Sequence, residues 1–143
     1  MTEAAFDIRD FLPYLLTQAA EESSLSFQRQ YRARHGILRS EWRVIFHLGR
    51  YGRLTAGEIG TRARLHKTKV SRAVAKLEGR RLLSRSPDPA DGRREWLELT
   101  PAGRQVFGEL EGLARDHQAR LLAPFSAEER DTLGRCLKQL AQL

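Results

Sequence analysis

Basic side chains that can contact a polyanion are concentrated in one short segment. Between residues 60 and 85, nine Lys and Arg residues are opposed only by Glu78, a formal charge of +8. The whole chain carries +7, so the other 117 residues sum to −1. Lys and Arg neutralise phosphates and supply most non-specific affinity for nucleic acid. The concentration of charge favours a nucleic-acid-binding segment, although a solvated basic helix face would show the same charge.

The spacing inside this segment separates an apolar face from a basic face. A helix from about His66 to Arg80 would place one set of apolar residues on its back: Val70, Ala73, Val74 and Leu77. Its front would carry Thr68, Lys69, Arg72 and Lys76. A recognition helix needs an apolar back for packing and a polar, basic front that enters the major groove. The pattern therefore predicts double-stranded DNA as the partner.

Two further elements are needed to position such a helix. Thr55 and Glu58 have capping-box spacing, which predicts a short helix that ends near Arg64 and completes a helix-turn-helix. Residues 82–85 and 96–99 have strand-like apolar content, and turn-forming residues 86–92 separate them. A basic-tipped hairpin therefore follows the second helix, as in a winged helix-turn-helix.

The patterns of the remaining segments predict helices with broad apolar faces. Residues 8–31 predict a long amphipathic helix that Pro13 bends or locally disturbs, and Ser40 is the expected N-cap of a second helix. Thr100 and Ser126 are expected to cap two C-terminal helices. A basic head of about 60 residues is too small to cover these faces. We therefore expect a homodimer, and packing of the helices on one another within a monomer is the alternative.

Three strings of residues resemble those of the MarR family of winged-helix transcription regulators. They are Leu54–Ile59, His66–Glu78 and the wing string Asp88–Arg94, which is followed by Leu-Thr-Pro-Ala-Gly at residues 99–103. The resemblance implies a mainly α fold with a small β-hairpin wing. It also implies one domain over 1–143, with interlocking dimerisation helices at 6–35 and 101–143 and a DNA-binding region at 40–100. A homodimer of this kind would bind a pseudo-palindromic operator and act by default as a repressor.

The resemblance also assigns DNA-binding residues position by position. The recognition-helix positions are Thr68, Lys69, Ser71, Arg72 and Lys76. Arg93 matches the wing arginine of the minor groove, and Asp91 matches the acid that orients it. Gly92 stands where many relatives have another arginine, and Arg94 is expected to compensate. For four of the bases, Lys67, Lys76, Arg80 and Arg81, we expect phosphate contacts rather than base contacts.

Members of the family are often released from DNA by small anionic aromatic ligands. Arg43, His47 and Arg50 form a cationic line at steps of four and three, which in the family would face the ligand site. We expect Arg43, His47, Trp42 and Arg9 to bind an aromatic acid effector. The alternative interpretation is that these basic residues form a solvated stripe and that Trp42 belongs to the hydrophobic core.

Other functions have less support in the sequence. Cys136 would permit an oxidant-responsive switch, but its apolar stripe favours a buried structural thiol. An effector-free architectural DNA-binding protein would share the basic head. The four histidines show no zinc-protease pairing, and serine-elbow and phosphate-loop motifs are absent, so we expect no enzyme, metal or cofactor. One cysteine and a longest uncharged stretch of ten residues predict a cytoplasmic protein without a membrane span.

Overall fold

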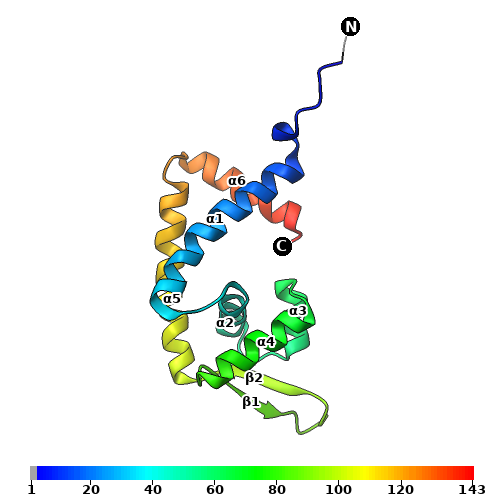
Figure 1. Cartoon of the computed structure of the whole chain (residues 1–143), viewed down its shortest axis with the longest axis vertical. Helices are drawn as coiled ribbons and strands as arrows, with labels where there is room; N and C mark the ends of the chain where they lie inside the picture. The colour runs from blue at the N-terminus through cyan, green and yellow to red at the C-terminus, as the bar shows by residue number, and fades with distance from the viewer. Residues whose placement is uncertain (1–2) are drawn as a thin grey trace.

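The computed structural model describes residues 3–143, and α-helices make up most of it (Figure 1). In chain order the elements are η1 (Ile8–Asp10), α1 (Leu12–His35), α2 (Arg39–Tyr51), α3 (Ala56–Ala63), α4 (Lys67–Gly79), β1 (Leu83–Pro87), β2 (Glu95–Leu99), α5 (Pro101–Leu122) and α6 (Ala127–Ala141). The mainly helical fold with a hairpin wing is confirmed. Among these helices, none combines the length and apolar character needed to cross a membrane.

The hydrophobic core lies in the head formed by α2, α3, α4 and the hairpin. Its buried side chains come mainly from residues 37–99, and Phe27, Tyr31 and Leu110 join them from α1 and α5. In Figure 1 the head occupies the lower half of the molecule, with the hairpin at its lowest end. Burial of the apolar back of α4 against α2 and α3 leaves its other face pointing outward.

The hairpin is attached to the helix-turn-helix by a third short segment. β1 pairs antiparallel with β2, from Leu83 opposite Leu99 to Pro87 opposite Glu95. Leu54, which immediately precedes the N-cap of α3, forms an isolated bridge with Leu97, with N–H to O distances of 3.1 and 2.8 Å. The hydrophobic pattern did not predict this bridge. It ties the wing directly to the start of α3.

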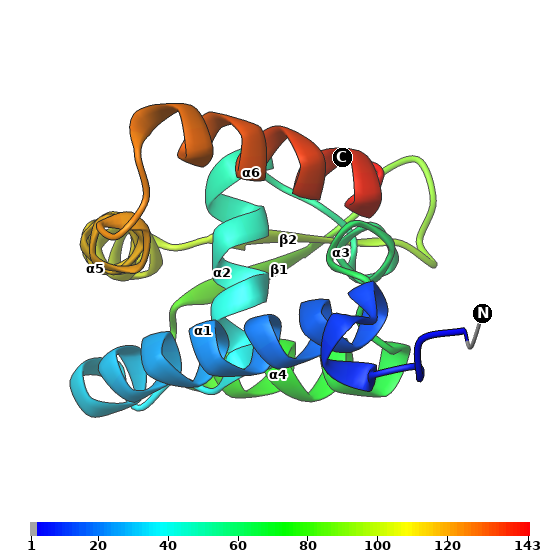
Figure 2. The ribbon, with the colours of Figure 1, turned by 90° about the horizontal axis from the view of Figure 1, so that it is seen from above.

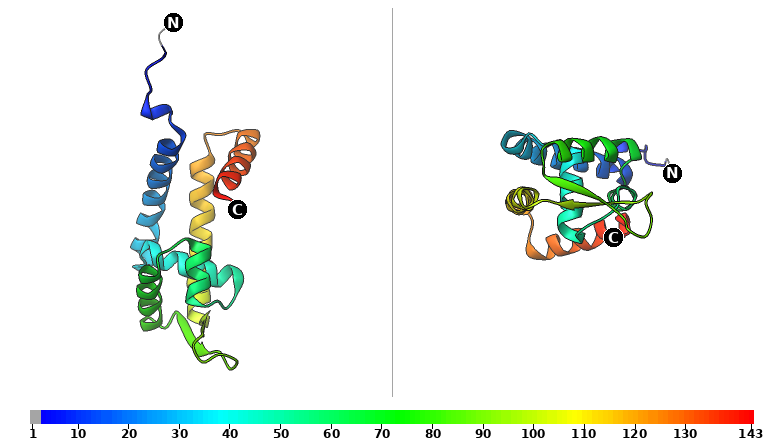
Figure 3. Two further views of the ribbon diagram at one scale, coloured as in Figure 1. Left: turned by 90° about the vertical axis from the view of Figure 1, so that its right-hand side faces the viewer. Right: turned by 90° about the horizontal axis from the view of Figure 1, so that it is seen from below.

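Helices α1, α5 and α6 extend away from the head and leave apolar side chains uncovered. α1 and α5 run side by side, and α6 turns back from the end of α5 (Figures 1 and 3). Seen from above, α1 and α6 lie on opposite sides of α2 (Figure 2). α6 has no buried residue, and Leu133, Leu137 and Leu140 are exposed along it. Cys136 is also exposed, so the burial that we expected for its thiol does not exist within one subunit.

Two predicted helix starts are wrong. Pro13 lies in the first turn of α1 and begins the helix instead of bending it, because a first-turn residue needs no backbone N–H partner. Leu38, and not Ser40, is the N-cap of α2, and its side chain makes no capping hydrogen bond. Gly36 ends α1 in the left-handed region, with φ 61°, so the chain re-enters a helix at Arg39.

Candidate nucleic-acid interface

Local capping sets the geometry of the helix-turn-helix. The Thr55 hydroxyl accepts from the Glu58 amide at 3.2 Å, and the Glu58 carboxylate accepts from the Thr55 amide at 3.1 Å. Arg64 ends α3 in the left-handed conformation, with φ 53°, and the His66 ring accepts from the Thr68 amide at the start of α4. The predicted capping box and the predicted pair of short helices are confirmed.

Helix α4 has one buried face and one exposed face. Val70, Ala73, Val74 and Leu77 are buried as expected, and the predicted DNA-contacting side chains of α4 are all exposed: Lys67, Thr68, Lys69, Ser71, Arg72 and Lys76. Because each residue turns a helix by about 100°, Thr68 and Arg72 lie directly opposite the buried face. We call this strip the crest of α4. The crest is the strip of α4 that points directly away from the hydrophobic core of the head.

The two flanks of α4 border different grooves. Lys69 and Lys76 line a groove of about 800 Å³ between α4 and α2, together with Arg39 and Arg43. Burial lowers the pKa of Arg43, and the like charge of Arg39 lowers it further. Sequence analysis did not single out Arg39, and it predicted Arg43 as an effector-binding residue.

The opposite flank faces α3 and the wing. Lys67 and Ser71 line a second groove, of about 470 Å³, with Thr61 and Arg85. Lys67 and Ser71 therefore border one side of the crest, and Lys69 and Lys76 border the other. This arrangement suits contacts with the two phosphate backbones that edge a major groove.

The wing tip is shaped by two aspartates through the backbone. The Asp88 carboxylate accepts from the Ala90 amide at 2.9 Å, and the Asp91 carboxylate accepts from the Arg93 amide at 3.0 Å. Asp91 thus contacts the main chain of Arg93 and not its guanidinium. The Arg93 side chain is exposed on the wing.

Arg94 is directed away from the role that we expected for it. Its Nη2 lies 3.4 Å from Glu58 Oε1, and its guanidinium carbon lies 5.2 Å from the centre of the Trp96 ring. Arg94 therefore folds back on the root of the wing, because an acid and an aromatic face are within its reach there. It does not replace the charge missing at Gly92 near the tip.

The four expected effector residues are not brought together within one chain. Trp42 packs against Phe27 and Phe46, whereas Arg43 faces the α4 groove, because neighbouring helical residues point about 100° apart. The His47 ring donates to the Arg43 carbonyl at 2.6 Å. Arg9 lies on η1, where it pairs with Asp7 at 2.7 Å.

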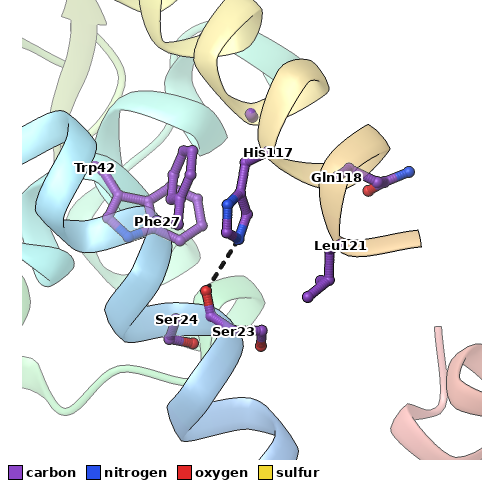
Figure 4. Close-up of a pocket in the computed structure, with 8 residues that line it drawn as sticks. Ser23, Ser24, Phe27, Trp42, His117, Gln118 and Leu121 are labelled. Atoms are coloured by element: carbon purple, nitrogen blue, oxygen red, sulfur yellow. Dashed lines mark hydrogen bonds between the residues drawn. The ribbon is translucent and has the colours of Figure 1, made fainter. Parts of the chain in front are cut away.

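A different set of residues surrounds Trp42. A pocket of about 230 Å³ between α1, α2 and α5 is lined by Ser23, Ser24, Phe27, Trp42, Ala114, His117, Gln118 and Leu121 (Figure 4). The His117 Nε2 donates to the Ser23 carbonyl at 3.1 Å, and its Nδ1 lies 3.4 Å from Gln30 Nε2. Sequence analysis missed this histidine. Its position on the apolar stripe of α5, after Leu110 and Leu113, was the available signal.

Comparison with known proteins gives consistent matches along the chain. The MarR family model matches residues 35–94. A probable transcriptional regulator from Pseudomonas aeruginosa is 28% identical with a TM-score of 0.79, covering 94% of this chain and 99% of that chain. The homoprotocatechuate degradative operon repressor of Escherichia coli is 22% identical over 95% of this chain and 91% of its own length. Bordetella bronchiseptica BpsR, whose DNA binding is regulated by 6-hydroxynicotinic acid, has a TM-score of 0.82 at 23% identity, covering 91% of this chain and 98% of BpsR.

The hairpin that follows the exposed α4 defines a winged helix-turn-helix protein. The family match covers this region from the end of α1 to the wing tip. The matching family model and the related transcriptional regulators support a MarR-type winged-helix protein that acts as a DNA-binding transcriptional regulator.

Proposed function

We propose that the chain is a sequence-specific repressor that binds a pseudo-palindromic operator as a homodimer. The crest of α4 carries this proposal, because Thr68 and Arg72 lie opposite a fully buried face and are bordered by basic flanks. Arg72 contacts base edges in the major groove, while Lys67, Lys69 and Lys76 contact phosphates at its sides. Repression follows the Escherichia coli relative, which is a repressor by name.

The wing extends the same interface. Arg93 is exposed beyond the helix-turn-helix, on a tip whose shape is maintained by Asp91. A guanidinium in this position matches the strong negative potential of a narrow minor groove. Each subunit thus reads one major groove with α4 and the adjacent minor groove with Arg93.

Homodimerisation is proposed from the state of α6. A 15-residue helix with no buried residue gains almost no packing energy, and short isolated helices are marginal in water. Its apolar stripe, with exposed Leu12 and Leu15 on α1, gives a surface that a second copy would cover. The symmetry of such a pair matches a palindromic site.

A charge placed on the α6 stripe tests the dimer and its DNA binding together. Leu137→Asp would bury a carboxylate between subunits, and it is expected to raise the dimer dissociation constant by about 100-fold or more. Operator affinity should fall with it, because a monomer contacts one half-site. Sedimentation velocity and DNA titration measure the two effects. Gln139→Asp is the matched control, since it adds the same charge about 160° around α6 from Leu137 and should remain dimeric. A monomeric wild type would refute the proposal.

We also propose that a small aromatic acid binds in the Trp42 pocket and releases the repressor from DNA. The volume suits a single aromatic ring, and Phe27 and Trp42 supply apolar walls. The acid group would accept from the Ser24 hydroxyl, because both ring nitrogens of His117 are already paired, one with the Ser23 carbonyl and the other with Gln30. Arg9 is 80% exposed along its side chain and would contribute only from a second subunit. The effector named for BpsR, 6-hydroxynicotinic acid, has this chemistry.

Filling the pocket separates effector binding from DNA binding. Ser24→Trp should occupy most of the pocket, leaving operator affinity within about 3-fold of wild type while raising the effector concentration for half-release by about 10-fold or more. Operator titrations with 6-hydroxynicotinate, homoprotocatechuate and benzoate as probes measure the release. Ala119→Trp, on the exposed side of α5, should respond like wild type. Release of Ser24→Trp at wild-type concentrations would place the effector elsewhere.

A further inference from the structure

The root of the wing contains a tryptophan contacted by two arginines. The guanidinium carbons of Arg53 and Arg94 lie 4.6 and 5.2 Å from the centre of the Trp96 ring, within cation–π range. Arg53 precedes the Leu54 bridge, and Arg94 precedes the first residue of β2. The cluster therefore joins the segment before α3 to the base of the hairpin.

Ion pairs connect the same hairpin to both helices of the helix-turn-helix. Arg94 Nη2 lies 3.4 Å from Oε1 of Glu58, whose other oxygen caps α3. On the other strand, Arg85 lies 3.1 Å from Glu78 of α4 and 3.3 Å from Glu95 of β2. One arginine thus braces the wing to α3, and the other braces it to α4.

These pairs reduce the positive charge that the wing can offer to DNA. Partly exposed ion pairs contribute little to the free energy of unfolding, so stability alone does not account for the Arg94–Glu58 and Arg85–Glu78 pairs at the base of the hairpin. A two-stranded hairpin is marginal without neighbours, and its direction depends on what holds its base. Arg85 and Arg94 are therefore less available to phosphates, but their ion pairs fix the direction of the wing.

We infer that Glu58, Arg94 and Trp96 are positioning residues that hold the wing at the angle at which Arg93 reaches the minor groove while α4 lies in the major groove. This inference rests on the proposed DNA-binding function. Arg94 acts through Arg93 and makes no DNA contact of its own. It follows that removal of the Glu58 charge weakens DNA binding, although the protein becomes more positive.

The sign of this effect distinguishes positioning from simple electrostatics. Glu58→Gln keeps a capping-box side chain but removes the ion pair and releases Arg94. We expect affinity for a duplex that the wild type enriches from a random pool to fall by about 3- to 10-fold. The slope of log K against log salt should fall by about 1, as Arg93 loses its contact. Glu98→Gln is the matched control, because it removes the same charge from β2, where Glu98 faces Arg104, and should bind as tightly as wild type or more tightly.

A double-mutant cycle with Arg93 tests whether Glu58→Gln lowers DNA affinity through Arg93. In an Arg93→Ala background, Glu58→Gln should cost less than 2-fold, because the residue through which it acts is gone. Trp96→Phe should retain part of the affinity that Trp96→Leu loses, with thermal unfolding confirming that each variant is folded. Tighter binding by Glu58→Gln, or an undiminished loss in the Arg93→Ala background, would overturn the inference. If the wild type enriches no duplex, the proposed function itself is refuted. If wild type and Glu58→Gln bind the duplex equally, only the positioning role of Glu58, Arg94 and Trp96 is refuted.

Discussion

Substitution of Gly103 by alanine is expected to lower the free energy of unfolding by about 3 to 5 kcal/mol. A Cβ atom at this position would lie 1.9 Å from the Leu82 carbonyl oxygen and 2.9 Å from its carbonyl carbon. Both obstacles are backbone atoms, which cannot rotate away as a side chain would. Close approach, and not an unusual backbone conformation, is the reason for glycine here.

Hydrogen bonds around Gly103 prevent the two segments from separating. The Thr100 hydroxyl donates to the Arg81 carbonyl at 2.7 Å and accepts from the Gly103 amide at 3.0 Å. The Thr100 amide donates to the Leu82 carbonyl at 3.0 Å. Relief of the clash would break this junction between the wing and α5, so the strain should spread into the core.

Urea denaturation of the intact chain measures the effect of Gly103→Ala. Gly108→Ala on the same helix is the control, because a Cβ there meets open space. Alanine has the higher helix propensity, so this variant should be unchanged or more stable by up to about 1 kcal/mol. Equal midpoints for the two variants would show that α5 does not pack on Leu82 as described.

Arg72→Ala should cost about 1 to 3 kcal/mol on the cognate duplex, or about 5- to 150-fold in affinity, and alter the preferred base at one position. The expectation follows from the place of Arg72 on the crest of α4, opposite the buried face. Arg80, which follows the last residue of α4, is the matched control for charge. Arg80→Ala should weaken all sequences similarly and reduce the salt slope by about 1.

Anisotropy titrations of each variant with a cognate and a scrambled duplex separate the two roles. Arg72→Ala is expected to narrow the gap between the two duplexes, whereas Arg80→Ala should preserve it. An Arg72→Ala variant with equal losses on both duplexes would assign Arg72 to the phosphate backbone and leave base reading to Thr68 or Ser71.

The elements that sequence patterns predicted well are those governed by near neighbours. The buried back of α4 follows from three- and four-residue spacing, and the Thr55–Glu58 capping box spans one helical turn. These features need no knowledge of the rest of the chain. The helix-turn-helix and the hairpin were therefore predictable as elements and in their order.

The site features that were missed depend on residues far apart in the chain. Glu58 and Arg94 are separated by 36 positions, and the carbonyl that the His117 ring contacts is 94 positions away. No local period reports such contacts, so Arg94 was expected at the wing tip and His117 was not singled out. The groove that Arg43 lines was not predictable for a simpler reason: the pattern placed Arg43 on α2 but did not show which neighbouring helix its side of α2 faces.

Selection of duplexes from a random pool by the wild-type chain tests the central claim most directly. Two subunits that each place α4 in a major groove predict an enriched inverted repeat, with half-site centres about 10 base pairs apart. Footprinting on that duplex should show one protected region of constant length as protein is added. A pool with no enriched sequence, or protection that lengthens with protein concentration, would contradict base reading by α4 and indicate a protein that coats DNA without sequence preference.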